Sequence, residues 1–409
     1  MATTPPATRI LSLDVIRGVA VMGILLANLP AFALPEAAYF SPLAAGGSTG
    51  WNRVVWLANY VLVEGKMRGL FTFLFGASML VVVDAADAAG NSAAAVHLRR
   101  MATLFLIGCL HLYLLWWGDI LSHYALVGSA AFMFARLRAR WLIALGIVLL
   151  TLQFLDDVAL GSLLTQSAAR DTAGHIATWR GFAEAFGVPD ADVLRADIAG
   201  IGGGFVDGIA YRWAHESSPF TVLPLIGLQT LGMMLLGMAG YRTGFLTGDW
   251  TPRRYALIAT FCLVPTLLVY TALGLSTIAH QFDQRWVFFG SILASEPIRP
   301  VMVVGYAALL MLVMRRHGPI TRRLAAVGRT AFTNYLGTTV MMTFVFSGWG
   351  LGQFATWSRA SLYWLAPLAW AIMLLWSPWW LARYRYGPLE WVWRTIARGR
   401  CQPLRRPAA

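Results

Sequence analysis

Apolar runs of about 20 residues recur from one end of the chain to the other, and they constrain the fold more than any other feature. A helix of about 20 residues is needed to cross the hydrocarbon core of a bilayer. Charged residues make up 12% of the chain, against about 25% in soluble domains, so a water-soluble surface cannot be built. The sequence predicts an all-α, polytopic membrane bundle of about ten helices, with spans at Leu13–Leu34, Val54–Val83, Met101–Trp117, Asp119–Ala135, Trp141–Leu155, Phe220–Phe245, Tyr255–Leu275, Ile298–Met314, Thr330–Ser347 and Leu362–Leu381.

The predicted spans fall into two groups around one long hydrophilic segment. We expect an N-terminal bundle of five spans at 1–155, a small acidic helical insertion at 156–218 and a second bundle of five spans at 219–385. An amphipathic surface helix and a basic tail follow at 386–409. These features leave the oligomeric state open.

The positions of the basic residues predict how the chain is oriented in the membrane. Lys and Arg accumulate in cytoplasmic loops. With the N-terminus inside, 22 of the 32 basic residues fall in inner segments and 8 in outer ones, while Lys66 and Arg68 lie within a span. We therefore expect both termini in the cytoplasm and the insertion outside. The net charge of +13 then reflects membrane orientation, and the expected partners are membrane lipids and not nucleic acid.

The N-terminus also permits a secretory-signal interpretation. Arg9 and Arg17 precede or begin an apolar stretch that ends in Ala31-Phe32-Ala33, which resembles a signal with its cleavage site. Asp14 inside this stretch favours a retained first helix.

Ionisable residues within the spans are the most informative positions for function. Each costs about 2.5–3.5 kcal/mol on insertion scales, so a chain that keeps several must pair them or use them. They gather in the first half of this chain, in the four earliest spans: Asp14, Arg17, Glu64, Lys66, Arg68, His111, Asp119 and His123.

Lys66 is the only lysine of the chain, and the other 31 basic residues are arginines. An ammonium can lose its proton when buried, whereas a guanidinium cannot, so proton chemistry or a compact anion site could require lysine here. An ion pair with Glu64 or Asp119 that closes the bundle is the alternative. The run Val54–Val83 is too long for one straight crossing, and Gly65 beside the charged stretch predicts a break, with an interfacial helix at Trp51–Val63 before it.

His111, Asp119 and His123 are expected on one wall of the hairpin between the third and fourth spans. Asp119 and His123 are four residues apart, and Gly118 predicts a tight turn. A carboxylate that orients an imidazole is the usual support of a general base. An interhelical hydrogen bond is the alternative. No metal site is expected, since no histidine or cysteine ligand pair has the required spacing.

Six groups of residues resemble the motifs of the YeiB-like bacterial membrane proteins, a family of unknown function (domain four-one-eight). They span nearly the whole chain: Leu13-Asp14-Val15-Ile16-Arg17-Gly18 with Asn28, Gly65-Lys66 with Phe73-Leu74-Phe75-Gly76, Arg99-Arg100 with Gly108-Cys109-Leu110-His111, Gly118-Asp119-Ile120-Leu121, Gly328-Arg329-Thr330, and Gly387-Pro388-Leu389-Glu390-Trp391. The resemblance implies a multi-pass protein of the bacterial inner membrane. It supplies no activity.

The first four spans are also remotely similar to the transmembrane acyltransferase superfamily, in which a Leu-Asp-x-x-Arg-Gly segment opens the catalytic bundle. This likeness implies transfer of an acyl group from cytoplasmic acyl-CoA, the implied cofactor, to an acceptor on the far side, such as an envelope glycan or lipid. Related enzymes have a catalytic histidine near the start of the bundle, but the first histidine here is His97. The base is therefore assigned from the residues alone.

Acyl transfer is the function that we expect from these residues. His111 or His123 would act as the base, Asp119 would orient it, and Lys66 or Arg68 would hold the reacting oxyanion. Contacts to the substrate are expected from Glu64, Asp14, Arg17 and Asn28, and contacts to the CoA phosphates from Arg99 and Arg100. Two rivals stay open: a transporter or channel for an anionic or lipidic solute, and a non-catalytic envelope scaffold.

Overall fold

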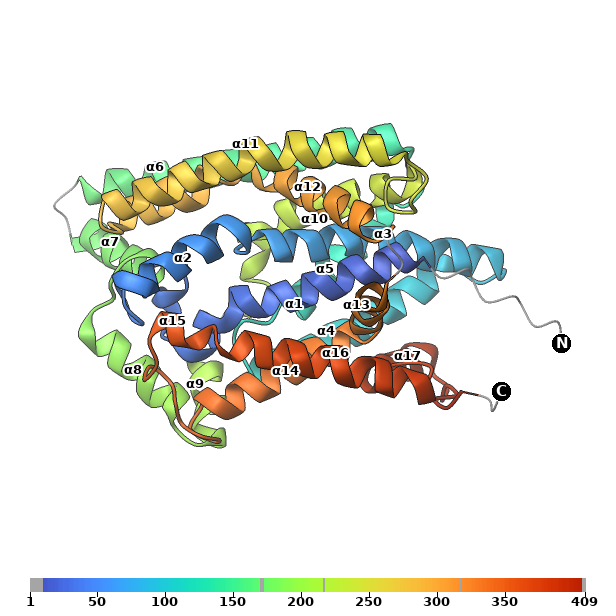
Figure 1. Cartoon of the computed structure of the whole chain (residues 1–409). Coiled ribbons are helices and arrows are strands. Elements are labelled where there is room, and N and C mark those ends of the chain that lie inside the picture. Colours follow the sequence, from blue (N-terminus) through green and yellow to red (C-terminus); the bar gives the residue numbers. More distant parts are fainter. Residues whose placement is uncertain (1–9, 170–172, 216–217, 316–317, 407–409) are drawn as a thin grey trace.

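The chain forms a bundle of helices in the computed structural model, which describes residues 10–169, 173–215, 218–315 and 318–406. The long helices run side by side (Figure 1). One end of the bundle carries α7 to α9 and is called the insertion end here. The opposite end carries α17 and the start of α1, and is called the α17 end. The all-α class predicted from the sequence is confirmed.

Each predicted span overlaps a helix, although Val54–Val83 is divided between α2 and α3. These helices are α1 Leu11–Ala33, α3 Lys66–Ala88, α4 Ala93–Leu114, α5 Leu121–Ala131, α6 Ala139–Ala168, α10 Val222–Arg242, α11 Pro252–Ala279, α12 Arg299–Val313, α14 Ala331–Phe346 and α16 Leu365–Arg383. Within the described ranges, seven helical segments are long and apolar enough to cross a membrane. The chain is therefore a multi-pass membrane protein. Because α5, α12 and α14 have only 11, 15 and 16 residues, the count of ten crossings stays a prediction.

The connecting segments are mostly helical too. They contain η1 Glu36–Tyr39, α2 Gly50–Leu62, η2 Phe132–Phe134, α7 Ala173–Phe186, α8 Ala191–Gly202, α9 Phe205–His215, the π-helix η3 Trp286–Leu293, α13 Pro319–Arg329, α15 Arg359–Leu362 and α17 Pro388–Arg398. Helix α6 runs past the predicted end at Leu155 to Ala168, so the separate helices of the insertion begin at α7. Arg9 of the signal-like pattern lies outside the described residues.

The break predicted at Gly65 is present. Helix α2 ends at Leu62 and α3 begins at Lys66, and Gly65 between them has a φ of +69°. This left-handed conformation favours glycine. A β-carbon at Gly65 would also lie 2.7 Å from Nε of Arg299, so the turn and the neighbouring guanidinium both require glycine.

Small residues allow α3 and α10 to cross closely. A β-carbon on Gly76 would meet the Met234 carbonyl oxygen at 2.0 Å, and one on Gly237 would meet the Phe73 carbonyl oxygen at 1.7 Å. Helices in membranes associate through such close backbone approaches. The crossing brings Arg68 of α3 against Gln229 of α10, and so helps to position the buried polar groups.

Candidate functional site

His111 and Asp119 form a buried pair in the hairpin between α4 and α5. Nδ1 of His111 lies 2.8 Å from Oδ1 of Asp119, and the two side chains are 1% and 0% exposed. The other carboxylate oxygen of Asp119 accepts hydrogen bonds from the backbone N–H of Ser122 at 2.9 Å and from its hydroxyl at 2.7 Å. Both oxygens of Asp119 are therefore held, and the carboxylate fixes the orientation of the imidazole.

The local sequence explains why this carboxylate lies where it does. Helix α4 ends at Leu114 and α5 begins only at Leu121, so residues 115–120 are non-helical. Irregular backbone within a membrane must find its hydrogen bonds inside the protein. Asp119 supplies one by accepting from Ser122, whose N–H in the first turn of α5 has no partner within the helix.

The second ring nitrogen of His111 faces a hydroxyl of α14. Nε2 lies 3.1 Å from Oγ1 of Thr339. Because a carboxylate only accepts hydrogen bonds, we assign the ring proton to Nδ1, which leaves Nε2 as an acceptor. An imidazole fixed by a carboxylate, with its basic nitrogen directed at a hydroxyl, has the geometry of a general base.

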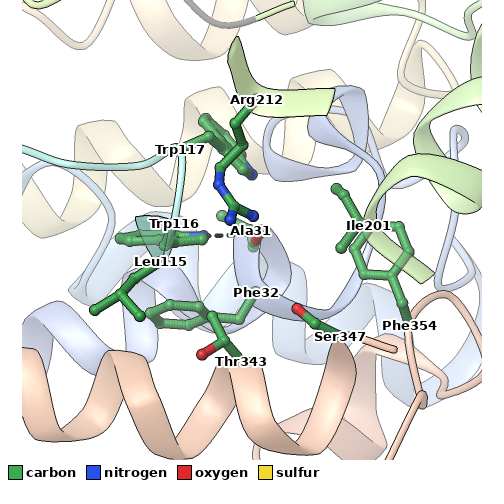
Figure 2. Close-up of a pocket in the computed structure, with 10 residues that line it drawn as sticks. All are labelled: Ala31, Phe32, Leu115, Trp116, Trp117, Ile201, Arg212, Thr343, Ser347 and Phe354. Atoms are coloured by element: carbon green, nitrogen blue, oxygen red, sulfur yellow. Dashed lines mark hydrogen bonds between the residues drawn. The ribbon is translucent and has the colours of Figure 1, made fainter. Parts of the chain in front are cut away.

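A pocket lies between this hairpin and the insertion (Figure 2). It is lined by Ala31, Phe32, Leu115, Trp116, Trp117, Ile201, Arg212, Thr343, Ser347 and Phe354. His111 lies directly behind Trp116, since the two rings meet edge to face with centroids 6.2 Å apart. Thr343 is one helical turn from Thr339 and donates a hydrogen bond to its carbonyl at 2.8 Å. The pocket is thus one layer of side chains away from Nε2.

The insertion covers this pocket. Arg212 of α9 reaches toward Ala31 and Trp116 (Figure 2). Its guanidinium donates to the carbonyl oxygens of Tyr113 at 3.1 Å and Leu114 at 2.9 Å, in the last turn of α4. The carbonyl of Ile201 in α8 accepts from the N–H of Gly348 at 3.2 Å, just after α14. Two helices of the insertion therefore dock on the two elements that carry His111 and Thr339.

His123 faces a different helix from His111. Nε2 of His123 lies 2.9 Å from Oγ1 of Thr230 in α10, and its Nδ1 is buried without a hydrogen-bond partner. His111 contacts α14 instead. The single wall expected from the sequence is therefore not formed. Asp119 lies before the first residue of α5, so the helical i, i+4 spacing assumed for Asp119 and His123 does not apply.

Lys66 lies at the break, as expected, but its contacts differ from the prediction. Its ammonium donates to the carbonyl of Tyr60 and lies 3.4 Å from the ring centroid of Tyr270, and the residue is 0% exposed. Tyr60 belongs to the last turn of α2, where carbonyl groups lack partners within the helix. The structure thus gives Lys66 a carbonyl and an aromatic face, and not the alternative ion pair with Glu64 or Asp119.

Arg68, which is half-buried, begins a chain of polar side chains that links three segments. It donates to Oε1 of Gln229 at 3.0 Å, and the amide of Gln229 donates to Oε1 of Glu296 at 2.5 Å. Glu64 is separate from this chain and lines a second pocket near α2. The sequence analysis did not identify Gln229, Glu296 or the buried Arg299 as site residues. Their position as polar residues within or next to apolar runs could have marked them.

The remaining predicted site residues lie elsewhere. Arg17 contacts Asp14 at 3.2 Å and Ser78 at 2.7 Å, near the start of α1. Asn28 is half-buried in α1 and lines neither of the two pockets described here. Arg99 is exposed, and the guanidinium of Arg100 lies 4.3 Å from the ring centroid of Trp393 in α17. These positions are not brought together with His111.

Thr339 and Ser122 were also missed by sequence reasoning. Both are common helix residues, and only their distance in space from His111 and Asp119 marks them. A metal is not indicated by the described part of the chain, in which no three His, Cys, Asp or Glu side chains gather as ligands.

Comparison with known proteins identifies relatives along almost the whole chain. The family model described as "Protein of unknown function (DUF418)" matches residues 240–400. The uncharacterized protein YeiB of Escherichia coli is 32% identical over 397 residues, which cover 95% of this chain and 96% of that protein. The uncharacterized protein YxaH of Bacillus subtilis is 26% identical, with 97% and 96% covered.

No solved structure matches the chain. The family resemblance inferred from the motifs is confirmed, because the chain is 32% identical to YeiB over 95% of its length. The chain therefore belongs to the YeiB-like, DUF418 family of multi-pass membrane proteins.

Proposed function

We propose that this protein transfers an acyl group from a cytoplasmic acyl-CoA to a hydroxyl of an acceptor on the insertion side of the membrane, with His111 as the general base. The observation that carries the proposal is the His111–Asp119 pair, with Nδ1 on the carboxylate at 2.8 Å and Nε2 on a hydroxyl at 3.1 Å. The pocket next to the pair is small, so an acceptor would have to displace side chains to reach the imidazole.

In the proposed reaction, the acceptor hydroxyl enters beneath the insertion and replaces Thr339 as the group that faces Nε2. His111 takes the hydroxyl proton as the oxygen attacks the thioester carbonyl of the acyl-CoA. The carbon–sulfur bond then breaks, and the proton passes from His111 to the leaving thiolate, which departs as CoA thiol. Trp116 separates the pocket from His111, so binding of the acceptor must move this side chain.

The assignment of roles follows from the contacts. Asp119 holds the imidazole and stabilises its protonated form during the transfer. Arg99 and Arg100 would contact the CoA phosphates, since both belong to the first turns of α4, at the end of that helix far from His111. His123 is not needed for this scheme, because its Nε2 is directed at Thr230.

Turnover of radiolabelled acetyl-CoA by the full-length protein in lipid nanodiscs, supplied with envelope extract as acceptor, tests the proposal. We expect His111→Gln to lower turnover by about 10²-fold or more. The matched control is His123→Gln, a buried histidine in the next helix, which should retain the wild-type rate. Equal rates for wild type and His111→Gln, or no turnover by the wild type, would contradict the proposal.

Solute transport is the second candidate, and the ionisable side chains around the α2–α3 break favour it. Glu64, Lys66 and Arg68 lie within five residues of each other inside a membrane protein, where such groups commonly mark substrate pathways. Uptake of anionic solutes into proteoliposomes tests this candidate. Uptake that Arg68→Gln abolishes and His111→Gln leaves unchanged would favour transport over acyl transfer.

A further inference from the structure

Two carboxyl groups meet between α6 and the turn that follows η3. Asp157 lies in the second half of α6, and Glu296 lies between the end of η3 at Leu293 and the start of α12 at Arg299. Their side chains are hydrogen-bonded to each other. Neither residue lines the pocket beside His111, so this pair is separate from the site used in the proposed acyl transfer.

The hydrogen bond between the two side chains requires a proton on one of them. An ionised carboxylate only accepts hydrogen bonds. Nε2 of Gln229 donates to Oε1 of Glu296 at 2.5 Å, and this orientation of the amide is fixed because its oxygen accepts from Arg68 at 3.0 Å. Nε2 of Gln153 donates to Oδ1 of Asp157 at 3.4 Å. Each carboxyl group thus accepts from its own amide, and a proton must supply the bond between them.

The charges around the pair also favour one shared proton over two ionised groups. Two carboxylates at hydrogen-bonding distance repel each other, so that one of them keeps its proton. Asp156, the neighbour of Asp157 in α6, adds a further negative charge. Arg299 acts electrostatically on Glu296, but it also acts on Glu64. A second negative charge on the pair would therefore compete for a guanidinium that two carboxylates already share.

The pair connects two parts of the bundle and is open on one side. Glu296 is 9% exposed, whereas Asp157 is half-buried, so a proton can reach the pair through Asp157. One turn further along α6, a β-carbon on Gly161 would lie 2.5 Å from the ring of Phe289 in η3. The pair is therefore placed where α6 packs directly on the π-helix. Ionisable groups in membrane helices commonly belong to proton pathways, and π-helical turns often occur at functional sites.

We propose that Asp157 and Glu296 form a proton-binding site, in which one proton shared by the two carboxyl groups holds α6 against the turn after η3. When the proton leaves to water, its electron pair stays on the carboxylate oxygen. Two carboxylates then face each other, and their repulsion separates the two segments. The inference does not rest on the proposed acyl transfer, because it uses neither His111 nor its pocket.

Infrared spectroscopy of the full-length protein in lipid nanodiscs at pH 7 tests the site, because a protonated carboxyl group has a C=O stretch distinct from that of a carboxylate. We expect Asp157→Asn to lose one carboxylic-acid band of the wild type. Glu296→Gln should lose the same band, since the acid that remains no longer has a partner with which to share a proton and ionises. The matched control is Asp156→Asn, which changes the adjacent, exposed acid and should keep the band.

Hydrogen exchange measures the contact between the two segments. At pH 9, the backbone amides of η3 in the wild type should exchange about tenfold faster than those of Asp157→Asn at the same pH. The reason is that asparagine donates to Glu296 through an amide that has no proton to lose at this pH. Asp156→Asn should exchange like the wild type.

Three results would overturn the proposal. The first is a wild type without a carboxylic-acid band that Asp157→Asn removes. The second is a band that Asp157→Asn removes and Glu296→Gln keeps, because the proton would then belong to Asp157 alone. The third is equal exchange of η3 in the wild type and Asp157→Asn at pH 9. If Glu296→Gln fails to fold, the exchange comparison still decides, since it uses only the wild type and variants of α6.

Discussion

One buried carboxylate at the α17 end and two buried atoms at the insertion end differ in their hydrogen bonding. At the α17 end, one carboxylate of α17, Glu390, accepts hydrogen bonds from the N–H groups of Phe332 at 2.8 Å and Thr333 at 3.1 Å. It also accepts one from the Thr333 hydroxyl at 2.6 Å. At the insertion end, Oδ1 of Asn59 and Nε of Arg299 are buried without hydrogen-bond partners.

The hydrogen bonds to Glu390 join α17 to α14, whereas Asn59 Oδ1 and Arg299 Nε make no such link. A satisfied buried network adds rigidity, whereas an unsatisfied buried group destabilises the protein unless something else provides its partner. Both pockets lie at the insertion end, where α2, η1 and the insertion helices meet the bundle (Figure 1). Under the proposed acyl transfer, the His111–Asp119 pair and its pocket lie at the insertion end, and Glu390 at the α17 end has a structural role.

Some family motifs find their explanation at the α17 end. Gly328 approaches α1 so closely that a β-carbon would lie 1.8 Å from the Asp14 carbonyl oxygen. Arg17 pairs with Asp14 beside this contact, and its guanidinium also reaches Ser78. The segments around Asp14, Gly328 and Glu390 are distant in sequence but lie together at one end, so their residues close the bundle and need not take part in chemistry.

The largest expected effect concerns which end faces the cytoplasm. If the α17 end is cytoplasmic, a reporter fused at Ala168 should be active only in the outer compartment, and one fused at His317 only in the cytoplasm. His317 lies outside the described residues, between α12 and α13. Alkaline phosphatase and green fluorescent protein fusions measure the two compartments. If both signals were reversed, the insertion end would face the cytoplasm and the α17 end the outer compartment.

The next effect distinguishes a carboxylate at the insertion end from one at the α17 end. Asp119→Asn should lower acetyl-CoA turnover about 10²-fold or more, because a neutral amide no longer stabilises the protonated imidazole. Glu390→Gln changes a buried carboxylate at the α17 end and should retain the wild-type rate. The measurement is turnover per folded molecule in nanodiscs. If both variants lose turnover equally, the two ends do not differ in function.

Variants of Lys66 test whether this residue stabilises the fold or takes part in chemistry. Because its ammonium caps α2 and lies over Tyr270, Lys66→Met should lower the free energy of unfolding by about 1–3 kcal/mol. Lys66→Arg should also be destabilising, since a larger guanidinium must fit where the residue is 0% exposed. Turnover per folded molecule should persist in both variants. Loss of turnover with unchanged stability would assign Lys66 to chemistry instead.

The sequence predicted features that depend on local patterns. The break at Gly65 followed from a run too long for one crossing, and the pairing of His111 with Asp119 followed from a short hairpin. Both involve residues close in sequence, where helical spacing and turn length limit the possible arrangements.

Contacts between distant segments could not be predicted in the same way. Thr339 is 228 positions from His111, and nothing in a threonine within an apolar run indicates its partner. Lys66 was expected to contact an acid or a bound anion, and the fold brings Tyr270 of α11 over it. A carbonyl and an aromatic face can satisfy an ammonium as a carboxylate can, and charge pattern alone does not distinguish them.

The smallest expected effect is on stability at the α17 end. Glu390→Ala removes the acceptor for two N–H groups in the first turn of α14, and loss of such a cap costs about 0.5–2 kcal/mol. Glu390→Gln should cost less, because its amide oxygen can still accept from Phe332 and Thr333 while its NH₂ group donates to the Thr333 hydroxyl. Thermal unfolding in nanodiscs measures the difference between the two variants.

The pH dependence of the same variants sharpens the result. Burial raises the pKa of Glu390 above its ordinary value of 4.5, although hydrogen bonds from Thr333 and Phe332 oppose the shift. The folded state therefore binds this proton more tightly than the unfolded state, so its contribution to stability is greatest at low pH and declines as the pH rises above about 4.5. Glutamine does not titrate. The stability of wild type relative to Glu390→Gln should thus fall between pH 4 and pH 7. A difference that stays constant or grows over this range would mean that the hydrogen bonds, and not burial, dominate at Glu390.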